Sequence, residues 1–453
     1  MSAEKDRESN RLTGRIGRYA RVGTNVGGIA AKMAGARLFG LELDNEKHAI
    51  ELASALGGLK GPLMKVAQLL STIPDVLPPE YTAELAKLQA DAPPMGWAFV
   101  KRRMRAELGA DWQSRFAEFD KAPSAAASLG QVHRATSHEG ADLACKLQYP
   151  DMASAVEADL RQLQVLFSIH RRMQPAIDTR EIAMEIGERV REELDYRREA
   201  ANMAAYRTIF EQNDRIRVPD VKSDLSTGRL LTMGWLEGEP LLSFREHSLE
   251  ERNRIAETMF HAWWHPFSHF GLIHGDPHLG NYTVFSDESQ PAGINLLDYG
   301  CIRIFPANFV AGVVDLYLGL LEDDEARIVS AYERWGFKGL TKDLIEVLNV
   351  WARFIYGPLL SDRVRSIADG ISPAEYGRKE AFRVHKALKE LGPVTVPREF
   401  VFMDRAAIGL GGVFLHLRAE LNFYQLFNEQ IEHFSVEKVG QRQKELLRGA
   451  GLK

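Results

Sequence analysis

Apolar residues recur every three or four positions in the segment GPLMKVAQLLST, residues 61–72. Leu63, Val66 and Leu70 therefore fall on one face of a helix, while Lys65 and Gln68 project from the opposite face. Residues 46–110 as a whole are predicted to be helical. The proline-rich stretches PDVLPPEY and DAPPM interrupt or close these helices, because proline cannot continue one.

The pattern changes near residue 116, and a small α/β lobe is predicted from there to residue 235. The segment ADLACKLQYP has the short apolar run of a strand, and we expect that strand to end at Lys146. The segment MASAVEADLRQLQVLFSIHRRM and residues from about 180 to 211 are predicted to be helices. GRLLTMGWLEG predicts a strand that leads into a hinge, and residues 236–453 are predicted to be mostly helical.

These patterns divide the chain into four predicted parts. They are a basic N-terminal segment (1–45), a helical extension (46–115), an N-lobe (116–235) and a C-lobe with a helical C-terminus (236–453). Small residues recur every fourth position in the first part, which lets helices approach closely. We favour a helix packed on the body of the protein there, and the alternative is a basic amphipathic segment lying on an anionic membrane surface.

Composition excludes several classes of protein. A net charge of −5 over 453 residues gives no basic excess for nucleic acid. Two cysteines are too few for a disulfide framework, which fits a reducing compartment. The sequence contains no run of 18 apolar residues, so no transmembrane helix is predicted. The start MSAEKDRESN lacks the apolar core of a signal peptide. We therefore expect a cytoplasmic protein, with peripheral membrane contact as the alternative.

The segment HGDPHLGN, residues 274–281, and the later segment INLLDYGCI suggest chemistry. Asp276 is followed five residues later by Asn281, and Asp298 closes an apolar run before Tyr-Gly. Protein kinases use this order: the first carboxylate orients an acceptor or a water, and the Asn and second Asp hold magnesium. A single HGD turn would mean little, but both motifs in this order predict a site for ATP and Mg²⁺.

Lys146 is the candidate phosphate-binding lysine, because a lysine within an apolar strand has to snorkel or be paired. Glu193, Asp195 and Glu199 follow on the helix predicted for residues 180–211. Their spacing does not place all three on one face, so one of them could face Lys146. Read alone, these residues would be an edge-strand lysine and a solvated acidic face.

The segment PSAAASLGQVHRA, residues 123–135, lies where a phosphate-binding loop is expected, but its residues are mostly alanine. Ala125, Ala126 and Ala127 would narrow the approach of backbone amides to phosphate, and Ser128 could offer a hydroxyl group instead. From composition alone, such a stretch is more often part of a helix.

Six segments in this order resemble the UbiB family of atypical kinase-like proteins, specifically its coenzyme Q-associated branch. They are KVAQLLSTIPDVLPPEYTAELAKLQADAPP, AAASLGQVHRA, CKLQYP, ELDYRREAAN, HGDPHLGN and LLDYG. RIGRYARVG near the start and DRAAIGLGGVFLHL near residue 410 also resemble that branch. The resemblance covers nearly the whole chain.

This resemblance implies an α+β, protein-kinase-like fold of two lobes, with a helical N-terminal extension over the active site. It implies slow hydrolysis of MgATP and support of ubiquinone or other isoprenoid-lipid biosynthesis. Lys146 would hold the phosphates and pair with Glu199, and the backbone near Leu236 would meet adenine. Lys65 and Gln68 would occupy the space where ordinary kinases bind a peptide substrate, and Glu193 and Asp195 would face the extension. The phosphate and metal chemistry would fall to Asp276, Asn281 and Asp298.

Two departures from the family pattern stand out: the glycine of the K-x-G-Q signature is Ala67 here, and the metal motif has tyrosine in place of phenylalanine. Two alternatives to a UbiB-type ATPase stay open. One is a small-molecule phosphotransferase of the aminoglycoside or choline kinase type, and the other is a nucleotide-sensing scaffold without turnover. Expected partners are ATP, isoprenoid or quinone-precursor lipids and other ubiquinone-biosynthesis proteins.

Overall fold

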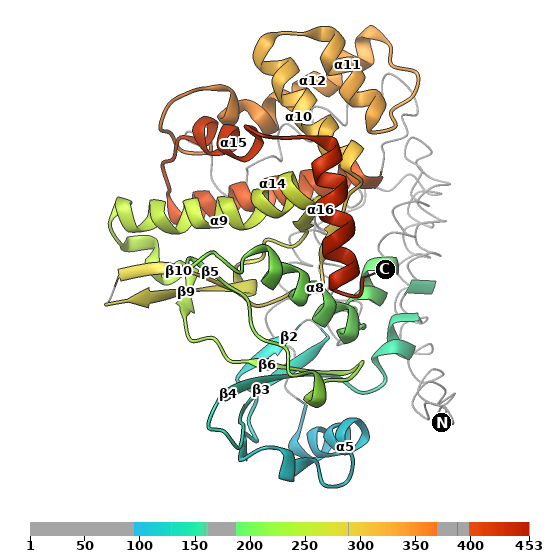
Figure 1. Cartoon of the computed structure of the whole chain (residues 1–453), viewed down its shortest axis with the longest axis vertical. Helices are drawn as coiled ribbons and strands as arrows, with labels where there is room; N and C mark the ends of the chain where they lie inside the picture. The colour runs from blue at the N-terminus through green and yellow to red at the C-terminus, as the bar shows by residue number, and fades with distance from the viewer. Residues whose placement is uncertain are drawn as a thin grey trace, which may run out of the picture. The chain divides into compact units, whose positions relative to one another are not determined.

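The computed structural model describes residues 95–127, 129–157, 160–161, 187–288, 290–368, 387 and 398–452. The chain packs as two compact units. The first unit ends at Tyr196 and takes in Lys222–Met233, and the second contains Arg197–Val221 and Gly234–Lys453. Figure 1 shows the elements of both units.

The described part of the first unit contains a five-stranded sheet with helix α5 packed on it. Its elements are α5 (Trp97–Leu108), η1 (Trp112–Arg115), β1 (Glu118–Phe119), β2 (Ala125–Ala127), β3 (Gly130–Thr136), β4 (Asp142–Gln148), η2 (Ser223–Leu225) and β6 (Leu230–Gly234). The strand order is β1-β3-β4-β6, with β2 paired to β3. Cys145 and Leu147 of β4 join the core formed with α5. Because side chains alternate along a strand, Lys146 points to the opposite face of the sheet.

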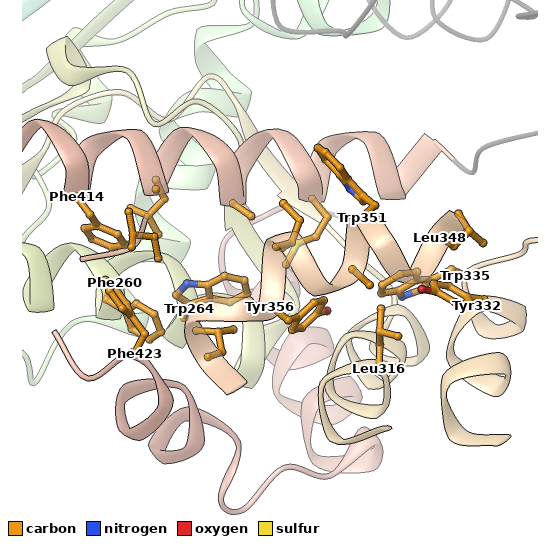
Figure 2. A pocket seen from close by; sticks show the side chains of 18 residues that line it. Phe260, Trp264, Leu316, Tyr332, Trp335, Leu348, Trp351, Tyr356, Phe414 and Phe423 are labelled. Atoms are coloured by element: carbon orange, nitrogen blue, oxygen red, sulfur yellow. The ribbon is translucent and has the colours of Figure 1, made fainter. Parts of the chain in front are cut away.

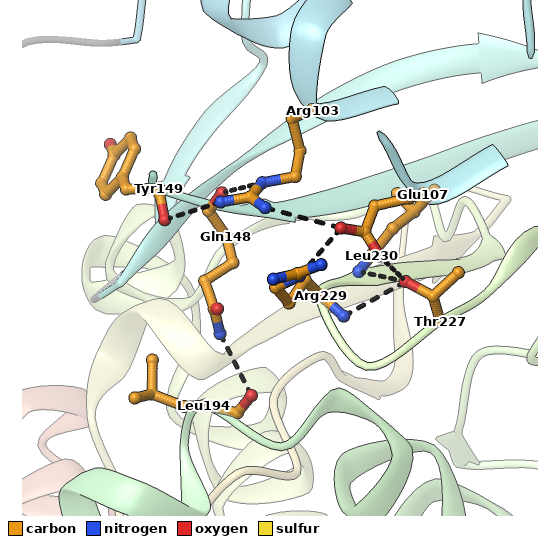
Figure 3. Close-up of polar contacts among 8 residues, drawn as sticks. All are labelled: Arg103, Glu107, Gln148, Tyr149, Leu194, Thr227, Arg229 and Leu230. Carbon is orange, nitrogen blue, oxygen red and sulfur yellow. Dashed lines mark hydrogen bonds and ion pairs between the residues drawn. The ribbon is translucent and has the colours of Figure 1, made fainter. Parts of the chain in front are cut away.

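A buried polar network fastens α5 to the end of β4 (Figure 3). The Arg103 side chain is 3% exposed and donates from Nε to Gln148 O at 3.2 Å and from Nη2 to Tyr149 O at 3.2 Å. Glu107, one turn along α5, accepts from Arg229 Nε at 2.9 Å. Buried charges of this kind are tolerated because each is paired and hydrogen-bonded. The network fixes the backbone two residues beyond Lys146.

The single helix predicted for residues 180–211 is wrong, because the helix is interrupted at residues 193–195. Residues 187–192 are helical, and α8 runs from Tyr196 to Ile209. At the break, Asp195 N donates to Glu192 O at 2.9 Å, a tight turn rather than a helical bond, and Tyr196 N turns to Gly228 O at 3.4 Å. Glu193 and Asp195 therefore lie in the turn, and only Glu199 lies on α8.

Two local predictions around the lysine strand also need correction. β4 does not end at Lys146 but continues to Gln148. The alternative that the alanine-rich stretch is a helix fragment is wrong, because Ala125–Ala127 form β2, with Ala125 opposite Val132 and Ala127 opposite Gly130. Pairing with a neighbouring strand decides the conformation here, against the helical preference of alanine.

The described part of the second unit is mostly helical, as predicted, and also contains two small sheets. Its helices are α8, α9 (Leu249–Phe270), α10 (Ala307–Glu322), α11 (Glu325–Arg334), α12 (Lys342–Tyr356), α14 (Arg398–Leu417), α15 (Phe423–Ile431) and α16 (Val436–Gly449), with short turns η3 (Leu241–Glu246), η4 (Leu279–Asn281) and η5 (Gly357–Leu360). The strands are β5 (Ile216–Arg217), β7 (Glu239–Pro240), β8 (Leu272–His274), β9 (Tyr282–Asp287), β10 (Gln290–Leu296) and β11 (Ile302–Ile304). One sheet has the order β5-β10-β9-β7, and β8 pairs with β11.

The long helix α9 leads directly to the segment HGDPHLGN. Ser248 and Glu251 form a capping box at its start, and Gly271 ends it with φ of 69°. Trp263 is 1% exposed and donates from Nε1 to His274 O at 2.9 Å. The helix thereby holds the strand from which the candidate catalytic turn begins. Among the described residues, no helix combines the length and apolar composition needed to cross a membrane.

Three histidines, His261, His265 and His269, lie one turn apart along α9. The rings of His265 and His269 are 4.2 Å apart between centroids. Burial lowers the pKa of His265 to about 4, and the neighbouring imidazoles and Arg442 act in the same direction. The folded state therefore disfavours a proton that the unfolded chain accepts at its ordinary pKa of about 6.5.

Stability should consequently depend on the protonation of His265. The contribution of the neutral His265 side chain to the free energy of unfolding is fully present above pH 6.5. It is lost as the pH falls from 6.5 toward 4, and the loss is on the order of 2–3 kcal/mol. Replacing His265 with glutamine removes the titrating group, so the free energy of unfolding of the variant should fall less over this interval. Urea unfolding of both proteins at pH 7, 5.5 and 4.5 measures the difference. Parallel curves would contradict the assignment.

Candidate active site

The two motifs HGDPHLGN and LLDYG meet because their flanking strands pair. β8 and β11 are antiparallel, with His274 opposite Ile302 and Leu272 opposite Ile304. Gly275 N also donates to Cys301 O at 2.8 Å. The turn that contains Asp276 and the turn that contains Asp298 are therefore brought to the same end of a two-stranded ladder.

His274 links the two aspartate residues through their backbones. Asp276 N donates to His274 Nδ1 at 3.2 Å, and His274 Nε2 lies 2.7 Å from Asp298 O. Because a backbone N–H can only donate, Nδ1 must accept, so the proton is on Nε2 and is donated to the Asp298 carbonyl. Burial of the 1% exposed side chain lowers the pKa of His274, which keeps the imidazole neutral.

Asn281 and Asp298 are oriented by hydrogen bonds within the same motifs. Asn281 Nδ2 donates to Asp276 O at 2.9 Å, so Oδ1 is the amide atom that could bind a cation. Asp298 Oδ1 accepts from Gly300 N at 2.8 Å. Leu297 N donates to Asn281 O at 2.8 Å, so the segment before Asp298 is tied to the end of the first motif. The backbones of Asp276, Asn281 and Asp298, the Asn281 amide and the Asp298 carboxylate are thus joined in a single network.

Helix α8 contributes a second set of contacts to the DYG turn. Glu199 is 2% exposed, and its Oε1 accepts from Tyr299 N at 3.5 Å, while Asn202 Nδ2 donates to Tyr299 O at 2.8 Å. The Tyr299 ring is fully buried and packs edge-on against Tyr206 at 5.4 Å. The position that is phenylalanine in the family pattern therefore serves as a hydrophobic anchor, and Tyr299 Oη donates to Leu296 O at 3.1 Å.

The oxygen ligands in this network suit magnesium. Mg²⁺ bound with a nucleotide usually takes one or two carboxylates, waters and phosphate oxygens rather than a cage of protein ligands. Asp298 and Asn281 offer hard oxygen donors of this type. In the part of the chain that the structure describes, no three His, Cys, Asp or Glu side chains form a group that could hold a metal ion.

Helix α14 packs on the candidate catalytic turn through a glycine. A Cβ atom added to Gly409 would lie 2.2 Å from Pro277 Cγ, closer than any real contact. Pro277 follows Asp276 directly in the sequence. The absence of a side chain at Gly409 therefore sets how closely the helix and the turn approach. The DRAAIGLGG segment resembles the family, but sequence alone gave it no role.

Lys146 belongs to the first unit, where an aromatic ring supports it. Its Nζ lies 5.3 Å from the centroid of the Tyr196 ring, and the two side chains are 8% and 1% exposed. A cation over the face of a buried aromatic ring is attracted by the ring quadrupole. Gly130 gives this arrangement space, because a Cβ there would lie 2.9 Å from Tyr196 Oη and 2.2 Å from Leu147 O. Tyr196 was not among the residues predicted for the site.

Removing the ring beneath Lys146 should weaken nucleotide binding. Tyr196→Leu loses the cation–π attraction of about 1–2 kcal/mol, so we expect the Kd for MgATP to rise about 5- to 30-fold. Tyr196→Phe keeps the ring and is the matched control, with affinity within about 2-fold of the wild type. Calorimetric titration gives both constants. Equal losses in the two variants would assign the effect to the hydroxyl group instead.

The remaining predicted site residues have varied outcomes. The Ala125–Ala127 stretch forms β2, and Glu193 is buried while Asp195 is exposed in the turn before α8. Leu236 lines an open pocket of about 590 Å³ with residues of α8 and β5. The predicted contact of the backbone near Leu236 with adenine stays a prediction. Lys65, Gln68 and Ser128 lie outside the described residues, as does Ala67. The Lys146–Glu199 ion pair stays a prediction.

Comparisons with known proteins agree with this geometry. Residues 87–332, more than half of the chain, match the ABC1 atypical kinase-like domain. The chain is 30% identical to AarF domain-containing protein kinase 1 of Xenopus laevis over 65% of its own length and 58% of the relative's. It is 28% identical to the mitochondrial atypical kinase COQ8 of Saccharomyces cerevisiae over 59% of its own length and 53% of the relative's. The chain thus spans little more than half of these two relatives.

A solved structure is also similar: the complex of Rv3197 with erythromycin from Mycobacterium tuberculosis. It matches with a TM-score of 0.60 and 28% identity, over 88% of this chain and 98% of that one. The predicted kinase-like α+β fold is thereby confirmed. With more than half of the sequence matched and both aspartate motifs joined through His274, the chain belongs to the ABC1 atypical kinase-like family, as its resemblance to the UbiB proteins predicted.

Proposed function

We propose that this protein binds MgATP and hydrolyses it slowly, as an atypical kinase-like ATPase that supports ubiquinone or related isoprenoid-lipid biosynthesis. The main support is the His274 bridge, which joins the backbones of Asp276 and Asp298 and so brings both motifs together. The match to the ABC1 domain and the similarity to an atypical kinase support the same assignment.

Each residue has a role in this proposal. The Asp276 carboxylate orients the water or acceptor that attacks the terminal phosphate. Asn281 Oδ1 and the Asp298 carboxylate hold Mg²⁺, which when bound neutralises charge on the phosphate oxygens. Lys146, steadied by Tyr196, binds the phosphates as a point charge. His274 is a positioning residue, since it touches the backbone of both aspartates rather than the reacting atoms.

Thermal unfolding with and without nucleotide tests the binding. Ligand that binds only the folded protein stabilises it by RT ln(1 + [L]/Kd), about 2.7 kcal/mol at a concentration of 100 Kd. We expect a rise in Tm with ATP and Mg²⁺ together that is larger than with ATP and EDTA. No rise at millimolar MgATP would contradict nucleotide binding altogether.

Phosphate release then separates the enzyme classes. Slow release in the absence of an acceptor supports an ATPase, whereas release that requires an aminoglycoside or a choline-like alcohol supports a small-molecule phosphotransferase. Binding without release identifies a nucleotide-sensing scaffold. Repeating the assay with anionic vesicles or phenolic quinone precursors tests the proposed link to lipid biosynthesis and to a membrane surface.

A further inference from the structure

The helices of the second unit line an apolar cavity of about 50 Å³, and none of its lining residues belongs to the HGD or DYG motif. Figure 2 shows the aromatic side chains that face it, from α9, α11, α12, α14 and α15. Trp264, Trp351 and Phe414 come from three different helices, so the space is built where several helices meet. Ligand pockets in helical domains commonly form in this way.

Three of the polar side-chain atoms in the lining have hydrogen-bond partners of their own. Tyr332 Oη donates to Asn349 Oδ1 at 2.9 Å, Tyr356 Oη donates to Val313 O at 3.2 Å, and Trp335 Nε1 donates to Phe309 O at 3.1 Å. These three residues therefore present carbon surface to the cavity. A polar group placed against that surface would lose its water without gaining a hydrogen bond, so the lining selects hydrocarbon.

The dimensions of the cavity favour a chain over a ring. Apolar cavities in proteins stay dry, and one of about 150 Å³ admits benzene. The cavity here is smaller, and it suits a single file of methylene or methyl groups. Ile355, Ile367 and Ala407 line it and are only partly buried, so we expect a chain to enter beside them.

We propose that this cavity binds the end of one hydrocarbon chain of a lipid or lipid precursor. The site uses none of the residues assigned to ATP and magnesium, so the proposal does not rest on nucleotide chemistry. Straight acyl chains and methyl-branched isoprenyl chains share the required apolar character. Each methylene group that enters should tighten binding about fourfold until the cavity is full.

Tryptophan fluorescence can report the chain directly. Trp264, Trp335 and Trp351, three of the seven tryptophans, line the cavity. A fatty acid brominated on its chain should quench them saturably. Ala407→Leu places extra carbon in the cavity and should raise the Kd for this probe at least 10-fold. Gly412→Leu on the same helix is the control, because a Cβ at Gly412 meets nothing within 4 Å, and its Kd should stay within about 2-fold of the wild type.

Ala352→Leu fills the cavity from α12 and serves as a second variant if Ala407→Leu unfolds, as thermal melts of all variants will show. Competition by dodecanol and by farnesol, which have the same main-chain length, distinguishes straight from branched chains. Displacement of the brominated probe by one or both alcohols supports the proposal and shows which kind of chain, straight or branched, the cavity accepts. Absence of saturable quenching in the wild type overturns it, and so does equal quenching in the folded filled variants and the control.

Discussion

Asp298→Asn should abolish the magnesium-dependent part of ATP stabilisation and lower ATP hydrolysis by about 100-fold. The substitution preserves shape, since an amide oxygen can still accept the 2.8 Å hydrogen bond from Gly300 N. It removes the negative charge that a hard divalent cation requires. The loss should therefore appear in Tm shifts with MgATP and in phosphate release, with an unchanged Tm in the absence of nucleotide.

A matched control for this variant is Asp287→Asn. Asp287 is an exposed aspartate at the end of β9 in the same unit. Its substitution changes the net charge identically but should leave nucleotide binding and hydrolysis at wild-type levels. If Asp298→Asn retained the full magnesium effect, Asp298 would not be a metal ligand and the proposed role of the DYG motif would have to be abandoned.

Gly409→Ala should destabilise the protein and slow hydrolysis, although alanine favours helix. Within α14 the added methyl group should gain about 1 kcal/mol of helix propensity. It would also meet Pro277 Cγ at 2.2 Å, and overpacking of this kind costs typically about 1–3 kcal/mol. Relief requires the turn that contains Asp276 to move, so we expect at least a 10-fold loss of turnover.

Gly412→Ala is the matched control, because it lies one turn along the same helix with open space around its Cβ position. This variant should gain only the higher helix propensity of alanine, which raises the free energy of unfolding by up to about 1 kcal/mol. Urea unfolding and steady-state ATPase rates separate the two variants. Equal stabilisation by both, with normal turnover, would show that α14 does not set the position of the catalytic turn.

The order of chemical groups along this chain could be predicted from sequence because it depends on short motifs. HGDPHLGN and LLDYG each contain their own turn, and the strand that leads to the hinge was predicted at the position of β6. The helical character of residues 236–453 follows in the same way from local periodicity. Such features need few long-range contacts, so composition and spacing are sufficient to indicate them.

Predictions failed where distant segments compete for the backbone. The helix expected over residues 180–211 breaks because Tyr196 N bonds to Gly228 O on another segment. The alanine stretch forms a strand because β3 offers it hydrogen-bonding partners. In both places tertiary pairing outweighs local preference, which is worth at most about 1 kcal/mol per residue.

By itself, the sequence determined the family and the identity of the charged and amide groups proposed for the site, since these depend on residue type and order. Only the tertiary structure decided how they are held. His274 lies between the backbones of Asp276 and Asp298, Tyr196 lies beneath Lys146, and Gly409 admits Pro277. These contacts join residues distant in the chain, and whether each group fits depends on distances of a few ångströms that no local pattern encodes.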